Sequence, residues 1–347
     1  MRVLSPVEAI QPAWDRAWGL VLKQPFRAKR AWKLGLVAIV AAMGGSPGVH
    51  LGGLHSHNNP LGAGVAAALA VVALFSALLF TGVGLVLFYL GSRMQFVVFE
   101  IVATAETTVA PKWNRYGTQT WRWIGLKLLY FLLMCAVLVV AAIPFIVRII
   151  QLIRSGTDLD SMEPMAVVHL VLGMLGLLLP VIVAAVLLCI GYYLLHDFVL
   201  PVLALENVGI FEATGCGLRA VFSQFWMLVG YILMRIVLCI GMSILAGLAV
   251  FAAVVVAAIP LAPIAAALYY GLHSGGAGAM ALMVCGFVVE GLVLLVWLVL
   301  FYLVVLAFVS LFYQSYALYY MGGLYEPLGN LLEPPAAPVE AAPLPAI

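Results

Sequence analysis

Long apolar runs with almost no charge constrain this chain more than any other feature of its sequence. The run from 225 to 259 contains a single charged residue, Arg235. The 347-residue chain is 66% hydrophobic and 9% charged, and its mean hydropathy is +1.18. A soluble domain is about 45–50% apolar and about 25% charged. The sequence therefore predicts an all-α fold, a polytopic integral membrane bundle whose main partner is the lipid bilayer.

Six runs are expected to form transmembrane helices, with interfacial helices between them on the cytoplasmic side. The runs are 32–43, which residues 28–33 could lengthen, 61–90, 123–150, 165–195, 225–259 and 280–312. The first is short, because a crossing needs about 20 residues, and it reaches that length only if its basic side chains snorkel to the interface. A cleaved secretory signal is the alternative, but the long polar lead-in favours a retained helix.

The fifth run has the opposite difficulty. As a helix it would be about 52 Å long, which exceeds the roughly 30 Å apolar core of a bilayer. Either the helix projects out of the bilayer, or Pro260 and Pro263 belong to a re-entrant segment or to a seventh crossing. The Pro and Gly residues of 260–278 favour a turn there.

The distribution of Lys and Arg predicts the orientation. Residues 1–33 carry seven of them and residues 91–123 carry four, whereas Arg148 and Arg154 are the two near the opposite loops. Because positively charged loops stay in the cytoplasm, both termini are expected there. The sequence shows no organelle-targeting signal, so a bacterial inner membrane is the default compartment.

The two ends of the chain differ from the apolar middle. Within 1–31, Trp14, Trp18 and Val21 share one helical face between basic residues. This spacing predicts an amphipathic helix on the membrane surface, with an unstructured basic lead-in as the alternative. The membrane domain is expected to span 1–325, followed by a disordered Pro/Ala-rich tail over 326–347.

The pattern E-x-V-x3-E-x-T occurs twice, in segments around 91–123 and 196–226, which are called here the first and second polar segments. Glu100 and Glu106 belong to the first copy, and Glu206 and Glu212 to the second. Six positions turn a helix by about 240°, so the two carboxylates of one copy do not form an acid–base pair. We expect a membrane-flush helix at each copy and a pseudo-repeat of the kind found in transporters, with solvated linkers as the alternative.

Two charges within apolar runs are a second candidate site. Arg235 lies about 15 Å into the fifth crossing, and Glu290 lies about 20 Å into the sixth from the opposite side. Because the two helices are consecutive and antiparallel, these depths predict a buried Arg235–Glu290 pair. Such a pair either fixes the register of two helices or takes part in proton- or substrate-linked movement.

Three histidines in a Gly-rich segment, His50, His55 and His57, form a weak candidate metal site. No Cys or carboxylate accompanies them, and solvated loop histidines are the alternative. The five cysteines show no disulfide or thiolate spacing. No motif indicates a catalytic residue or a cofactor, and the net charge of +2 gives no reason to expect nucleic acid.

The second polar segment also resembles a known family. Pro201, then Glu206-x2-Gly209-x3-Ala213, then Leu218 and Phe225-Trp226 resemble a pattern of bacterial polytopic membrane proteins. The pattern is similar to that of the membrane domain fused to some glycerophosphodiester phosphodiesterases and of its stand-alone relatives. The resemblance implies a multi-helix membrane fold without a settled activity. The phosphodiesterase domain itself has no room in this chain, so its activity is not expected.

These observations support two functions of different classes. The first is a non-enzymatic scaffold or accessory protein of the cell envelope, with membrane or cytoplasmic protein partners. The second is a transporter of small or lipid-linked molecules that uses Arg235 and Glu290. An intramembrane enzyme is less favoured, because such an enzyme should place several polar catalytic groups at one depth.

Overall fold

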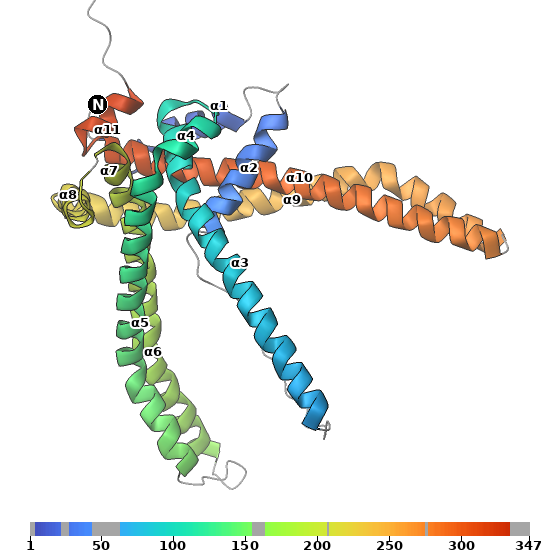
Figure 1. Ribbon diagram of the computed structural model, residues 1–347, viewed down its shortest axis with the longest axis horizontal. Helices are drawn as coiled ribbons and strands as arrows, with labels where there is room; N and C mark the ends of the chain where they lie inside the picture. The colour runs from blue at the N-terminus through green and yellow to red at the C-terminus, as the bar shows by residue number, and fades with distance from the viewer. Residues whose placement is uncertain are drawn as a thin grey trace, which may run out of the picture. The chain divides into compact units, whose positions relative to one another are not determined.

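A computed structural model describes residues 4–21, 28–43, 63–154, 164–206, 208–274 and 277–333 (Figure 1). These residues form helices joined by short connections, and no strand occurs among them. The prediction of an all-α fold is therefore confirmed. The described residues divide into two compact units, which are considered separately: unit 1 comprises 1–120 and 224–347, and unit 2 comprises 121–223.

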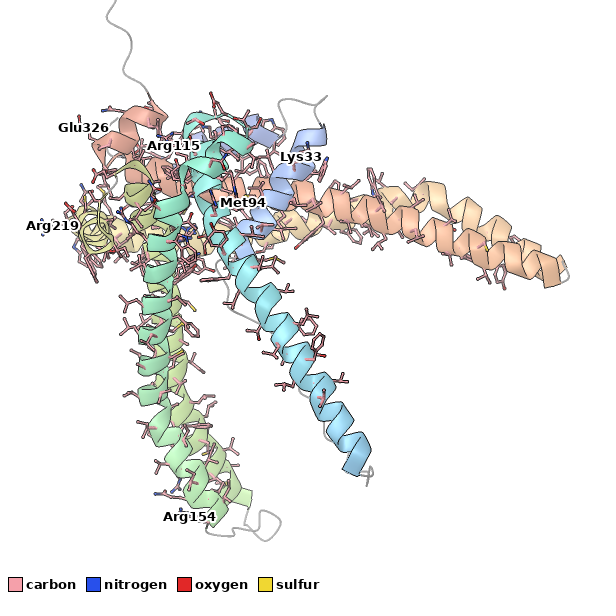
Figure 2. The ribbon with its side chains drawn as sticks, in the orientation of Figure 1. Lys33, Met94, Arg115, Arg154, Arg219 and Glu326 are labelled. Atoms are coloured by element: carbon pink, nitrogen blue, oxygen red, sulfur yellow. The ribbon has the colours of Figure 1, made fainter. Side chains whose placement is uncertain are left out.

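Five helices are long and apolar enough to cross a membrane, by length and composition. Their apolar parts are Val71–Thr104, Gly117–Arg154, Val168–Leu205, Phe225–Ile259 and Val284–Gly322. The side chains along much of these helices are exposed, as Figure 2 shows for α3 (Ala63–Thr104) before Met94. Exposed apolar surface of this extent is what lipid covers, and the chain is a multi-pass membrane protein.

The first predicted crossing differs from the other five. It forms α2 (Ala28–Met43), a 16-residue helix that is about 24 Å long and too short to cross an apolar core of about 30 Å. Leu34 and Val37 are buried, and Gln95 of α3 donates a hydrogen bond to the Ala41 carbonyl at 3.0 Å. In the described residues α2 is thus a packed helix of the core, and five helices, not six, have crossing length.

The predicted turn over 260–278 is wrong. Helix α9 (Phe225–Ser274) continues through Pro260 and Pro263 for 50 residues, about 75 Å, and α10 (Ala277–Gly322) follows directly. Proline is tolerated inside membrane helices because neighbouring groups or local adjustments satisfy the freed backbone. Of the alternatives open from the sequence, the helix that projects beyond one bilayer thickness is the one observed.

The core of unit 1 surrounds the second half of α10. Helices α1 (Ile10–Val21), α2, α3, α9 and α11 (Glu326–Leu332) all pack against α10 or against its neighbours. Trp14 of α1 packs edge-on to Phe308 at 4.9 Å and to Phe312 at 5.9 Å between ring centroids. The predicted N-terminal helix exists, and Trp14 on its aromatic face packs against α10.

The end of the chain also differs from expectation. Residues 326–332, predicted to belong to a disordered tail, form α11. Leu328 and Leu332 are buried, and their spacing of four places both on one helical face. The surrounding sequence is rich in Pro and Ala, so this short apolar pair was not recognised as part of a helix. The predicted boundary at residue 325 is therefore wrong.

Unit 2 is an α-hairpin with a compact end. Helices α5 (Gly117–Arg154) and α6 (Pro164–Leu194) contact each other where the Tyr130 hydroxyl donates to the Leu188 carbonyl. A π-helical turn, η3 (Leu195–Val199), then leads into α7 (Leu200–Leu205), and α8 (Ile210–Phe222) packs against both. This packed end holds the second polar segment.

Candidate functional site

The first polar segment is an organised cluster in unit 1. Helix α3 ends at Thr104, residues 105–109 form a loop, and α4 (Ala110–Arg115) returns the chain toward α5. Ala105 has φ of 60°, a left-handed conformation that is uncommon for a residue with a side chain. This residue turns the chain sharply away from the axis of α3.

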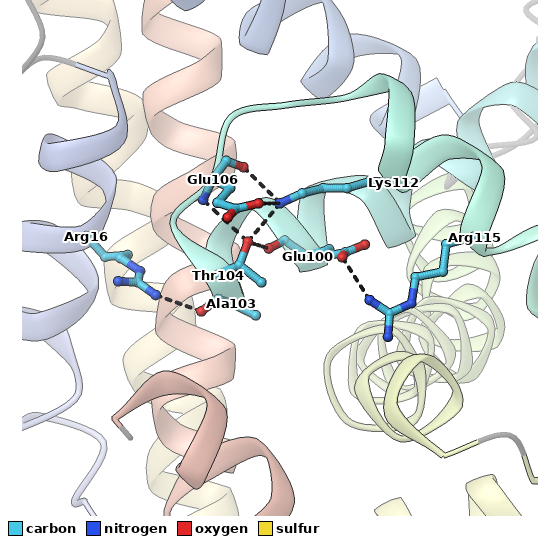
Figure 3. Close-up of polar contacts among 7 residues, drawn as sticks. All are labelled: Arg16, Glu100, Ala103, Thr104, Glu106, Lys112 and Arg115. Carbon is cyan, nitrogen blue, oxygen red and sulfur yellow. Dashed lines mark hydrogen bonds and ion pairs between the residues drawn. The ribbon is translucent and has the colours of Figure 1, made fainter. Parts of the chain in front are cut away.

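Lys112 holds both sides of that turn (Figure 3). Its ammonium donates to the Thr104 hydroxyl at 2.7 Å and to the Glu106 carbonyl at 3.0 Å. The Lys112 side chain is 4% exposed, whereas Glu106, whose carboxylate lies 3.9 Å away, is 71% exposed. Burial lowers the pKa of Lys112, and the charges of Glu100 and Glu106 oppose this shift. The lysine therefore acts as a clamp across Ala105.

Glu100 occupies the other side of the cluster. Its Oε1 accepts from Arg115 Nη1 at 3.1 Å, while its Oε2 is buried without a hydrogen-bond partner. Burial, together with the Glu100 carboxylate, raises the pKa of the nearby Tyr116 phenol, and Arg115 opposes the shift. Glu100 and Glu106 thus have separate partners, and because Glu106 lies in the loop after α3, the predicted helical turn of about 240° between them does not apply.

Two further arginines donate to backbone carbonyls around the same segment. Arg16 of α1 donates to Val102 at 2.9 Å and to Ala103 at 2.8 Å. Arg93 donates to the Trp113 carbonyl at 2.9 Å and stacks over the Trp113 ring. These bonds satisfy carbonyls that the end of a helix leaves open, and they tie α1, α3 and α4 together. No local pattern predicts the Arg16 contact, since it joins residues far apart in the chain.

The second copy of the motif has a different local structure. Glu206 ends α7 in an extended conformation, whereas Glu100 is helical. Glu212 lies in the first turn of α8 and is exposed. The prediction of two equivalent membrane-flush helices is therefore wrong: a six-residue helix follows the first copy and a 13-residue amphipathic helix holds most of the second.

Unit 2 holds a cluster that sequence reasoning missed. In η3, His196 Nδ1 lies 3.2 Å from Asp197 Oδ1, and Asp197 is buried. The ring of Trp123 lies 6.3 Å from the His196 ring, and Lys127 Nζ lies 5.3 Å from the Trp123 ring centroid. Lys127 is buried as well. Two sequence signals could have indicated this cluster. His196 and Asp197 follow directly after the apolar run 165–195, and Lys127 lies near the start of the apolar run 123–150.

Three titratable side chains thus gather around one buried indole. A π-helical turn is rare and is found frequently at functional sites. It shifts the following residues relative to the preceding helix and places Asp197 in the packed interior. Gly217 of α8 packs directly against η3, because a Cβ there would lie 2.7 Å from the Phe198 carbonyl oxygen. Within this group, His196 and Asp197 lie within hydrogen-bond distance of each other.

The predicted Arg235–Glu290 pair is not formed. Arg235 Nη1 donates to the Tyr231 hydroxyl at 2.7 Å, and the guanidinium lies 5.9 Å from the Tyr313 ring. Tyr313 and Glu290 belong to one continuous helix and are separated along it by about 34 Å. The depth argument failed because α9 continues to Ser274, well beyond the end of the fifth crossing predicted at residue 259.

The last candidates from the sequence are the three histidines of 50–57 and the five cysteines. His50, His55 and His57 lie outside the described residues. Among the residues that the structure describes, no group of three or more His, Cys, Asp or Glu side chains could hold a metal ion. All five cysteines are free.

Comparison with known proteins places this architecture in a family. A family model described as a family of unknown function, DUF7544, matches residues 4–331, which extend from before α1 into α11. No curated protein and no solved structure matches the chain. None of these comparisons links it to the membrane domain of glycerophosphodiester phosphodiesterases. The chain belongs to the DUF7544 family, a family of unknown function.

Proposed function

We propose that this chain is a non-enzymatic scaffold or accessory protein of a cell envelope, and that its exposed helices pack against other membrane proteins. The first polar segment carries this proposal. Lys112 of this segment and Arg16 of α1 donate to its backbone carbonyls or to a hydroxyl, and Arg115 donates to a carboxylate. These bonds hold the backbone in shape, which is the role expected of a rigid platform rather than of a reaction centre.

The exposed crossing helices give the platform its binding surface. Leu79 of α3 is 56% exposed and Leu172 of α6 is 58% exposed. Helices with this much free apolar surface associate with lipid or with other membrane helices. A scaffold needs such surface, whereas a transporter needs helices that enclose a path for its substrate.

The arrangement of unit 1 also bears on the proposed orientation. Arg16 of α1 contacts the end of α3, and α11 packs on both α3 and α10. The first and last described helices are therefore neighbours at one end of these crossing helices. Together with the excess of Lys and Arg in residues 1–33 and 91–123, this supports a cytoplasmic location for α1 and α11. The membrane we propose is an inner membrane of bacterial type.

Site-specific photo-crosslinking in native membranes tests the scaffold. A photoreactive residue at position 79 or 172 is expected to give discrete protein adducts. The same residue at Phe99, which is 1% exposed, is the matched internal control and should give none. Adducts to lipid alone at every exposed position along α3, α5, α6, α9 and α10 would contradict the proposal.

Transport is the alternative, and the separation of Arg235 from Glu290 removes the pair on which it rested. Purified protein in sealed vesicles separates the two functions. A scaffold leaves the proton and ion permeability of the vesicles at the protein-free level. A flux that Glu290→Gln abolishes would overturn the scaffold and favour transport through Glu290 alone.

A further inference from the structure

Helix α8 of unit 2 has a packed face and, beside it, an exposed apolar face. Ala213, Gly217 and Val221 form the packed face and are buried. Phe211 and Phe222 are 79% and 51% exposed. Eleven positions along a helix leave two side chains about 20° apart, so the two rings share one side of α8, about 120° from Gly217. This side therefore carries two large apolar rings that the fold itself leaves exposed.

The charged side chains of α8 lie on a third side. Glu212 and Arg219 are both exposed and lie about 100° and 80° from Phe211 around the helix. Leu218 is partly exposed and lies within about 20° of Phe211. Phe211, Leu218 and Phe222 thus form an apolar stripe, called here the α8 stripe, with charged groups along its border. An apolar side next to a charged side is typical of helices that lie in a membrane interface.

The contacts of α8 with the α5–α6 hairpin fix its level. Gly217 packs against η3, which follows directly after the apolar run 165–195. Ile210 Cδ1 would lie 3.9 Å from a Cβ at Gly125, near the start of the apolar run 123–150. Both contacts therefore place α8 at the level where an apolar run of the hairpin ends. In a bilayer this level is the boundary between the acyl chains and the headgroups.

The direction of α8 agrees with this level. Figure 1 looks down the axis of α8, whereas α5 and α6 run lengthwise across the same view, so α8 lies crosswise to the hairpin of unit 2. A helix that is crosswise to two crossing helices runs along the plane of the membrane. Trp121 of α5 and Tyr193 of α6 lie at the same end of the hairpin and are 65% and 54% exposed. Trp and Tyr are enriched where a membrane meets water.

We propose that α8 is a lipid-binding surface: the α8 stripe enters the leaflet at this end of the hairpin, and Arg219 contacts the phosphates of its headgroups. Figure 2 shows Arg219 directed away from α5. A long arginine side chain can reach the headgroups while its stem stays in apolar surroundings. Glu212, on the same side as Arg219, remains in water.

The position of α8 favours lipid over a protein as the occupant. Helices α5 and α6 expose apolar surface that lipid covers, and α8 lies at the end of that surface. The leaflet around the hairpin therefore reaches the α8 stripe without a further molecule. The surface goes beyond the proposed scaffold, which uses the sides of the crossing helices, because α8 fixes the depth of unit 2 in one leaflet.

Spin labels measure the depth of α8 directly. All five native cysteines are free, so a cysteine-free full-length chain loses no disulfide. Phe211→Cys, Phe222→Cys and Glu212→Cys then place one nitroxide each. In phosphatidylcholine vesicles, labels at 211 and 222 should collide more with oxygen, which concentrates in lipid, than with a water-soluble nickel chelate. The label at 212 is the matched control on the same helix and should show the opposite preference.

A pair of double variants separates lipid binding from packing. Phe211→Ser, Phe222→Ser removes two exposed rings and leaves the buried face of α8 unchanged, so unit 2 should still fold. Without the rings α8 should leave the interface, and amide hydrogen exchange across 210–222 should rise in the same vesicles. Phe211→Leu, Phe222→Leu should keep the exchange of the wild type, because leucine is also apolar and enters the interface.

Three results would overturn the proposal. The first is equal access of the nickel chelate to 211, 222 and 212, which would place the α8 stripe in water. The second is spin–spin broadening at 211 that disappears on dilution with unlabelled chain, which would make a second copy the occupant. The third is exchange of the wild-type level in the serine double variant. The vesicles contain only lipid and this chain, so these outcomes do not depend on the scaffold's protein partners.

Discussion

Gly35 of α2 lies directly against the backbone of Leu303 in α10. A Cβ at position 35 would lie 2.7 Å from the Leu303 carbonyl carbon and closer still to its oxygen. A helix backbone cannot move aside as a flexible side chain can. We therefore expect Gly35→Ala to separate α2 from α10 and to lower the free energy of unfolding by about 1–3 kcal/mol. Tryptophan fluorescence during thermal unfolding measures the change.

Gly19 provides the matched control, because it lies in a neighbouring helix with nothing within 4 Å of its added Cβ. Gly19→Ala should raise stability by about 0.5–1 kcal/mol, since alanine loses less backbone entropy in a helix. Equal melting of Gly35→Ala and the wild type would show that α2 does not depend on this close approach.

A second glycine tests the packing of α8. In Gly217→Ala the new Cβ would lie 2.7 Å from the Phe198 carbonyl oxygen, whereas Gly215 on the same helix has open space. We expect Gly217→Ala to loosen α8 from η3 and to raise amide hydrogen exchange across 210–222. Gly215→Ala should leave that exchange unchanged or lower it. Similar exchange in the two variants would argue against the contact.

The Lys112 clamp gives a third prediction. Lys112→Met keeps the apolar stem but removes the charged donor to the Thr104 hydroxyl and to the Glu106 carbonyl, both of which form part-buried hydrogen bonds. The cost should be about 1–3 kcal/mol of unfolding free energy, measured by chemical denaturation. Glu106→Gln, at a side chain 71% exposed, should cost less because water screens its contact with Lys112. Ala105→Gly should recover part of the Lys112→Met loss by relieving the left-handed backbone.

The distance between Arg235 and Glu290 predicts independent behaviour. Arg235→Gln removes the contacts with Tyr231 and Tyr313, and Glu290→Gln changes a group about 34 Å away. The two changes in unfolding free energy should add to within about 0.3–0.5 kcal/mol in the double variant. A coupling energy well above that range would restore the direct pair.

Alkaline pH should act on Tyr116. Its pKa is raised in the folded chain, whereas in the unfolded chain it titrates near pH 10. Above that pH the unfolded state loses the proton first, so this residue's contribution to stability is present below pH 10 and falls as the pH rises toward the folded pKa. Tyr116→Phe should flatten this part of the curve of unfolding free energy against pH. Parallel curves for variant and wild type would contradict the assigned shift.

Local composition determined which segments became long helices. Runs such as 225–259 satisfy their backbone within one segment and are apolar on every face, so the sequence predicts them without knowledge of the rest of the chain. The same reasoning mislocated the turn after α9. Proline is a reliable break in water, but Pro260 and Pro263 remain inside a membrane-length helix.

Tertiary structure alone decided which residues meet. A helix that is apolar on all faces carries no pattern to say which face packs, so neither the contact of Gly35 with Leu303 nor the neighbours of Glu290 could be predicted. Arg16 reaches Val102 across 86 positions of sequence, and no local signal encodes that contact. The sequence by itself determined that this chain enters a membrane as helices. The packing of those helices determined that Arg235 and Glu290 act apart, because one shifted turn moves every residue pair along the hairpin.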